Sequence, residues 1–195
     1  MPDFSGFVLA GGRSSRMGTD KAFLELNGRT LLARALDLLH ALTPEVCIVG
    51  PASRFAAYGP VVEDTYAGRG PLAGIHAALS ASATELNLIL AVDLPLVTES
   101  LLRFIVERAH ASDALVTVPR IAGGYQPLCA VYRRAFAPLA QAALEGGKNK
   151  IDALFAATTT RILEESELSR FAFSAAMFEN LNTPEDLRRA VPEKP

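Results

Sequence analysis

The chain has 195 residues, of which half are hydrophobic and 21% are charged, and its formal net charge at pH 7 is −2. This length is typical of one domain with a sizeable core, so we expect residues 1–195 to form a single domain. The slightly acidic balance excludes general binding to nucleic acid. No apolar run approaches the roughly 20 residues that a membrane span needs, and no signal peptide is visible, so we expect a cytoplasmic protein without a membrane partner. In that compartment, Cys47 and Cys129 are expected as buried thiols, with a disulfide as the alternative.

Apolar runs alternate with helical periodicities along the chain. Strands are expected at 6–10, 46–49, 61–63, 87–92 and 114–118, and helices at 31–42, 72–82 and over about ten residues after Thr98. Thr30 and Thr98 are the expected N-caps. The run NLILAV at 87–92 is apolar on both faces, as in a parallel sheet that helices cover.

The second half of the chain has a looser pattern. PLCAVY at 127–132 predicts an edge strand, and helices are expected up to Leu144 and within IDALFA. FENLNTPEDLRRA at 178–190 reads as a strand, a turn and a helix capped by Thr183. The order of elements predicts a three-layer α/β/α sandwich around a Rossmann-like, mostly parallel sheet with an antiparallel edge.

The loop after the first strand, GGRSSRMG at 11–18, is suited to binding an anion. Ligands of open parallel sheets bind at the carboxyl ends of the strands, where this loop lies. Gly11 and Gly12 allow backbone N–H groups to converge on phosphate oxygens, Arg16 can donate to two oxygens, and Lys21 adds a point charge. Neither GxxxxGK[ST] nor GxGxxG is present, and a turn with solvated arginines is the alternative.

Two carboxylates also directly follow predicted strands. Asp93 comes after the strand at 87–92, in VDLP, and can hold Mg²⁺ together with substrate phosphates and water. Asp64, in VVEDTY, is expected near the ribose, the base or a metal-bound water. A turn-forming or capping role is the alternative for each carboxylate.

Five motifs, taken together, carry a resemblance to a known family. LAGGRSSRMGTDKA, GPLAGI, VDLP, QPL and NLNTPEDL resemble those of the bacterial molybdenum cofactor guanylyltransferases, in the nucleotidyltransferase superfamily, from Phe7 to about Arg189. The resemblance implies an enzyme that transfers GMP from GTP to molybdopterin with Mg²⁺ as cofactor. The products are molybdopterin guanine dinucleotide and pyrophosphate. The resemblance leaves open whether molybdoenzymes or their chaperones are protein partners.

The resemblance also implies roles for individual residues. GTP contacts map onto Leu9, Ala10, Gly11, Lys21 and Asp64, and the carboxylate that holds nucleotide-bound Mg²⁺ maps onto Asp93. Lys21 and Asp93, together with Arg16, form the expected catalytic group. One departure is Gly50, at a position where a member of the family can carry a nucleotide-contacting asparagine.

The acceptor substrate is expected on the other side of the site. The resemblance places Gln126 at the border of the molybdopterin pocket and lets Lys148 and Asn149 meet its phosphate. Asn180 and Asn182 alternate on one face of a predicted strand near the active site, although Asn182 as a helix cap is the alternative.

Other functions compete with this assignment. A cytidylyltransferase acting on the same cofactor needs the same phosphate chemistry and a different base pocket. A sugar-1-phosphate or polyol-phosphate nucleotidyltransferase is a more distant alternative. A nucleotide-binding regulatory protein without turnover is disfavoured because the loop cations and Asp93 are all present.

Overall fold

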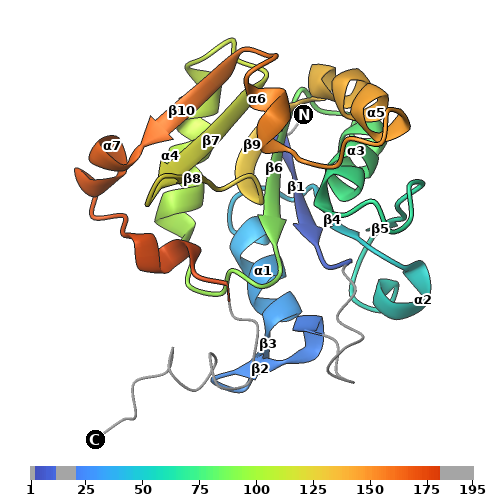
Figure 1. Ribbon diagram of the computed structural model, residues 1–195. Helices are drawn as coiled ribbons and strands as arrows, with labels where there is room; N and C mark the ends of the chain where they lie inside the picture. The colour runs from blue at the N-terminus through green and yellow to red at the C-terminus, as the bar shows by residue number, and fades with distance from the viewer. Residues whose placement is uncertain (1–2, 12–20, 181–195) are drawn as a thin grey trace, which may run out of the picture.

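A central mixed sheet with helices on both faces makes up the protein (Figure 1). The computed structural model describes residues 3–11 and 21–180. The strands of the sheet are β1 (Phe4–Leu9), β4 (Val46–Val49), β5 (Val61–Val62), β6 (Leu86–Ala91), β7 (Val116–Ile121), β8 (Gly124–Tyr125), β9 (Cys129–Arg133) and β10 (Thr160–Glu164). A separate two-stranded sheet pairs β2 (Glu25–Leu26) with β3 (Arg29–Thr30). The α-helices are α1 (Leu31–His40), α2 (Ala52–Phe55), α3 (Pro71–Ala81), α4 (Glu99–His110), α5 (Ala137–Glu145), α6 (Asp152–Phe155) and α7 (Glu165–Ser169). Three 3-10 helices, η2 (Lys21–Phe23), η3 (Arg134–Phe136) and η4 (Ala175–Phe178), complete the described elements.

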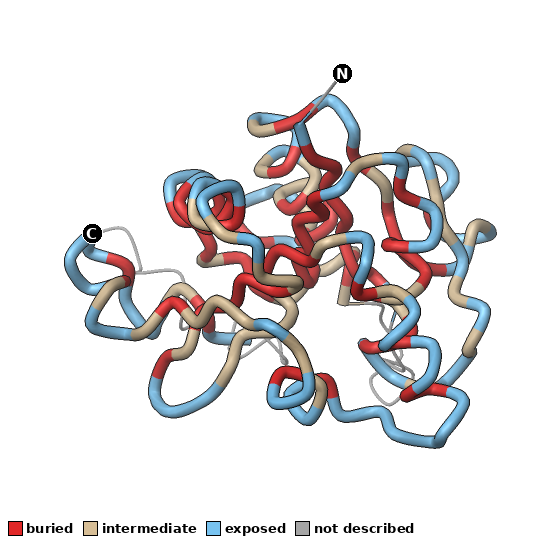
Figure 2. Tube along the Cα trace, turned by 90° about the horizontal axis from the view of Figure 1, so that it is seen from above, coloured by how far each residue is buried: buried red, intermediate tan, exposed pale blue. Residues whose placement is uncertain are grey.

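The layers follow from the alternation of side chains along buried strands. On β1, Phe4 and Val8 belong to the core beneath α1 and α4, whereas Phe7 and Leu9 belong to the core beneath α3 and α5. β6 behaves in the same way and is buried along its whole length. Figure 2 shows the buried residues gathered along the centre of the molecule. The predicted three-layer sandwich is confirmed.

Local signals set the ends of the main helices. The hydroxyl of Thr30 accepts a hydrogen bond from the N–H of Ala33, and that of Thr98 accepts one from the N–H of Leu101. Both predicted N-caps are therefore confirmed, and each side chain satisfies one helical donor that has no partner within the helix.

The strand in PLCAVY is not at an edge of the sheet. The sheet order is β10-β7-β9-β6-β1-β4-β5, so β9 lies between β7 and β6 and is antiparallel to both. Cys129, Ala130, Val131 and Tyr132 are all buried, as an interior position requires. The edges are β5 and β10, and the half-exposed β10 was not predicted from its mixed polar sequence.

The end of the described chain also differs from the prediction. Phe178 ends the 3-10 helix η4, and Asn180 lies in no regular element, so no strand begins here. The predicted helix after Thr183 lies outside the described residues. Among the helices that are described, none is long and apolar enough to cross a membrane.

Candidate nucleotide-binding site

The carboxyl ends of three neighbouring strands, β6, β1 and β4, are joined by backbone hydrogen bonds. Val92 N–H donates to Leu9 O at 3.1 Å, which joins the segments that follow β6 and β1. Ala10 and Gly11 both donate their N–H to Val49 O, at 3.0 and 3.1 Å, which joins β1 to β4. Leu9, Ala10 and Gly11, predicted as nucleotide contacts, are therefore fixed at this edge of the sheet.

Lys21 and Asp93 meet at the same edge. The Nζ of Lys21 lies 3.6 Å from Oδ2 of Asp93, and the two side chains are 26% and 23% exposed. Lys21 opens η2, which packs against α1, and Asp93 lies two residues beyond the end of β6. The structure thus brings together the loop lysine and the carboxylate that were predicted to act on one polyanion. Their catalytic roles remain predictions.

The turn that carries Asp93 is supported by a residue that the sequence did not indicate. Arg34, on α1, donates from Nη2 to the carbonyl of Pro95 at 3.4 Å. Within the turn, Leu94 N–H donates to Ala91 O, also at 3.4 Å. No motif marks Arg34 in the sequence, because its partner is a backbone carbonyl in a distant loop.

Gly50 is explained by packing. A Cβ placed on Gly50 would lie 2.7 and 2.9 Å from two ring atoms of Phe55, a side chain that is fully buried. Gly50 also lies against Gly11, since a Cβ on Gly11 would lie 3.6 Å from the Cα of Gly50. No side chain fits here, so the end of β4 offers a nucleotide only backbone groups.

Asp64 takes part in a turn beyond β5. Its Oδ1 accepts a hydrogen bond from Tyr66 N–H at 2.7 Å, which is the turn-forming role considered from the sequence. Asp64 follows β5, three strands away from β6, or about 14 Å at the usual strand spacing. Its contact with a nucleotide remains a prediction.

The GPLAG motif forms the start of α3. Gly70 has φ of +77°, a backbone conformation that favours glycine, and Pro71 is the first helical residue. The first turn of α3 carries no acidic side chain. This helix end therefore presents its partial positive charge to the carboxyl edge of the sheet.

The described acceptor-side residues come from three segments. Gln126 lies in the connection from β8 to β9, where the carbonyl of Leu128 accepts a hydrogen bond from Ala91 N–H at 2.8 Å, two residues before Asp93. Asn180 follows η4 and is exposed. Lys148 and Asn149 follow α5 and are also exposed. Gly12, Arg16 and Asn182 lie outside the described residues, and their roles stay predictions.

The two cysteines, which both lie among the described residues, are not activated thiols. Burial raises the pKa of the Cys129 thiol from 9.0 to about 12, and burial, with a smaller contribution from Glu45, also raises the pKa of Cys47. Both are free thiols, although Cys47 is only half-buried. A raised pKa keeps a thiol protonated and unreactive. Within residues 3–11 and 21–180, no three or more His, Cys, Asp or Glu side chains gather as metal ligands.

An open α/β sheet with glycine after its first strand and ionic side chains at its carboxyl edge is typical of nucleotide-binding proteins. The chain belongs to the MobA-like NTP transferase domain family, which matches residues 6–161.

Individual relatives are similar over nearly their full length. A probable molybdenum cofactor guanylyltransferase of Pelotomaculum thermopropionicum is 36% identical over 95% of this chain and 91% of its own. One of Carboxydothermus hydrogenoformans is 33% identical over 98% and 96% of the two chains. The crystal structure of molybdopterin-guanine dinucleotide biosynthesis protein A from Archaeoglobus fulgidus superimposes with a TM-score of 0.83 at 26% identity and covers 95% of this chain and 96% of that one.

Proposed function

We propose that the protein transfers GMP from GTP to the terminal phosphate of molybdopterin, giving molybdopterin guanine dinucleotide and pyrophosphate. The observation that carries the proposal is the approach of Lys21 to Asp93, 3.6 Å apart, at the edge of the sheet where Gly11 follows β1. Relatives that are 36% and 33% identical over most of the chain are named as guanylyltransferases of this cofactor, which supports the choice of substrates.

The chemistry is an exchange of one P–O bond for another. An oxygen of the acceptor phosphate forms a bond to the α-phosphorus of GTP, and the bond from that phosphorus to the bridging oxygen of the β-phosphate breaks. The nucleophile is already an anion, so no strong general base is required. The chief obstacle is repulsion between two anionic reactants and the charge that develops on pyrophosphate. Catalysis therefore depends mainly on positioning and electrostatic stabilisation.

The residues at the carboxyl edge would divide this task. Lys21, with Arg16, would neutralise charge on the triphosphate, and the backbone N–H groups of the loop after β1 would orient it. Arg34 would hold the turn of Asp93 through its bond to Pro95. Across the sheet, from β6 towards β5, the same edge would present the nucleoside with backbone groups at Gly50, where no side chain fits.

Asp93 fits the requirement for Mg²⁺ that the proposal includes. Mg²⁺ commonly binds to one or two carboxylates and takes its other ligands from water and substrate phosphates. Asp93 meets this need as a partly exposed carboxylate, and no further acidic or histidine cluster was found among the described residues. When bound, the ion would stabilise negative charge on the phosphates.

Pyrophosphate release by the purified protein tests the function. We expect release with GTP, Mg²⁺ and molybdopterin together, and none when either substrate or the metal is omitted. Activity with CTP in place of GTP would instead indicate the cytidylyltransferase. Activity with a sugar phosphate and none with molybdopterin would overturn the proposal.

A further inference from the structure

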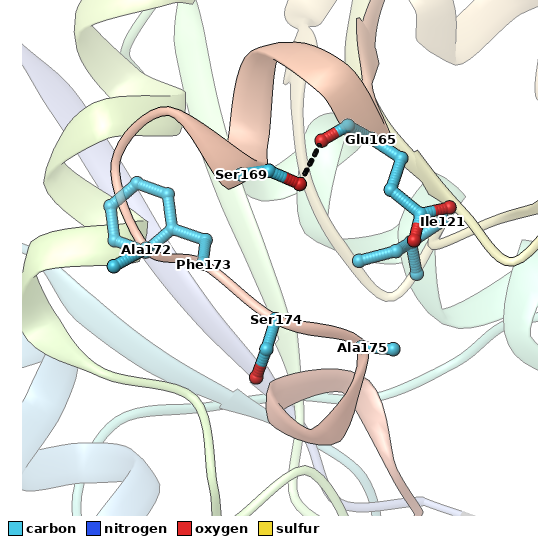
Figure 3. Close-up of a pocket in the computed structure, with 7 residues that line it drawn as sticks. All are labelled: Ile121, Glu165, Ser169, Ala172, Phe173, Ser174 and Ala175. Atoms are coloured by element: carbon cyan, nitrogen blue, oxygen red, sulfur yellow. Dashed lines mark hydrogen bonds between the residues drawn. The ribbon is translucent and has the colours of Figure 1, made fainter.

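A hollow lies beyond the end of β7, apart from Lys21 and Asp93. It has a volume of about 280 Å³ and is lined by Ile121, Glu165, Ser169, Ala172, Phe173, Ser174 and Ala175. Figure 3 shows Glu165 beside Ile121 on one wall, with Phe173 and Ser174 across from them. The wall segments are the end of β7, the helix α7 and the chain that leads into η4.

This pocket lies on the acceptor side of the proposed site. In the sheet, β7 is separated from β6 by β9 alone, so the ends of β7 and β6 are about 10 Å apart at the usual strand spacing. The two walls also lead to the two described residues that the resemblance assigns to the acceptor. Ile121 is followed by the hairpin into Gln126, and η4 is followed by Asn180.

The polar groups of the pocket include a carboxylate with spare acceptor capacity. Oε2 of Glu165 accepts a hydrogen bond from Ala122 N–H at 2.9 Å, which fixes the side chain. A carboxylate has about four lone-pair positions, so Glu165 can accept further hydrogen bonds. The hydroxyl of Ser169 donates to the carbonyl of Glu165 at 2.7 Å, drawn dashed in Figure 3.

These features select one kind of ligand group. A negative carboxylate repels a phosphate but binds neighbouring N–H donors. Ile121, Ala172 and Ala175 add apolar atoms to the walls around it. The pterin of molybdopterin has such an edge, in which a ring N–H and an amino group point the same way. Its phosphate would then lie towards Asp93.

We infer that this pocket binds the pterin ring of the acceptor and that Glu165 accepts hydrogen bonds from its ring N–H and amino group. The inference rests on the proposed function, because it assigns one end of the same substrate. Glu165 is then a specificity residue for the acceptor and takes no part in bond exchange.

The substitution Glu165→Gln in the full chain tests this role. Glutamine keeps the shape and an oxygen that can accept from Ala122 N–H, but it loses the charge that strengthens the bonds to the pterin. We expect the KM for molybdopterin to rise about 10- to 100-fold, while the KM for GTP stays unchanged. Glu45→Gln is the matched control, because Glu45 is exposed at the opposite end of β4 and should leave both KM values unchanged.

A second measurement does not depend on turnover. Free pterin, which carries no phosphate, should bind to the wild type, and its fluorescence should be quenched on binding. Ser174→Leu narrows the pocket and should abolish this binding. If the wild type makes the dinucleotide but Glu165→Gln keeps its KM for molybdopterin within twofold, the pocket assignment is wrong and the function stands. If the wild type makes no dinucleotide while pterin still binds in a Glu165-dependent way, the pocket stands and the function is wrong.

Discussion

The Nζ of Lys21 lies 3.6 Å from the carboxylate of Asp93, although Lys21 follows the first strand and Asp93 follows β6. The parallel pairing of β1 with β6, in which Leu9 lies opposite Ala91, brings the ends of these strands side by side, and η2, which carries Lys21, packs against α1. Two opposite charges at one sheet edge can bind a polyanion directly through the lysine and through a cation held by the carboxylate. The first two predictions test this pair.

Replacing Asp93 with asparagine should reduce the rate of GMP transfer by about 10²- to 10³-fold, because it removes an electrostatic interaction worth a few kcal/mol at the transition state. The rate of pyrophosphate release at saturating GTP and molybdopterin measures the loss. Asp113→Asn, an equal change at an exposed position before β7, should leave the rate unchanged. Unchanged turnover in Asp93→Asn would remove Asp93 from the mechanism.

Replacing Lys21 with glutamine should reduce the rate by a similar factor, with Lys21→Arg retaining part of the activity, because the positive charge remains. The folded state should lose less than about 1 kcal/mol, since the ion pair with Asp93 is partly exposed and screened by solvent. The double variant with Asp93→Asn should lose less than the product of the single losses, because both residues act on one substrate. Strictly multiplicative losses would show that the two act independently.

Replacing Gly50 with alanine should destabilise the protein by about 1–3 kcal/mol, because the new Cβ would overlap the buried ring of Phe55. Urea unfolding measures the change. Combining the substitution with Phe55→Leu should cost less than the sum of the two single changes, since the smaller side chain leaves room for the Cβ. Gly124→Ala, where the nearest atom would be 3.8 Å away, is the control and should change stability much less.

Stability should fall at alkaline pH because of Cys129. Its pKa is about 12 in the folded state and 9.0 ordinarily, so between these values the folded chain holds a proton that the unfolded chain has lost. The free energy of unfolding therefore decreases as pH rises through this window, by up to about 1.4 kcal/mol per pH unit. Between pH 8 and 10, the wild type should lose about 1.4 kcal/mol more than Cys129→Ala, as measured by urea unfolding at each pH. Tyr132, whose pKa burial also raises, is present in both proteins and cancels in the comparison. An equal loss of stability in the wild type and in Cys129→Ala would show that Cys129 does not cause the pH dependence.

Features with local causes could be predicted well. The caps at Thr30 and Thr98, the buried strand β6 and the carboxylates that follow β5 and β6 are found where the sequence indicates them. Each depends on a spacing or a residue type within a short window, such as a hydroxyl before a helix. The third strand, expected at 61–63, differs only by one residue at its end.

Features that depend on distant partners could not be predicted. The interior position of β9 depends on which strands it pairs with, and apolar residues on both faces suit any fully covered strand. Arg34 supports the turn of Asp93 through a backbone carbonyl, which no motif records. The pocket around Glu165 forms only where α7 returns to the end of β7.

The sequence by itself determined the alternating α/β elements and the chemical groups at the strand ends, because helical and strand periodicity and capping act between near neighbours. Only the tertiary structure decided that Lys21 meets Asp93 and that Gly50 faces Phe55. Strand order and the packing of helices on the sheet set distances between residues far apart in the chain, and these depend on the summed burial of apolar surface over the whole molecule.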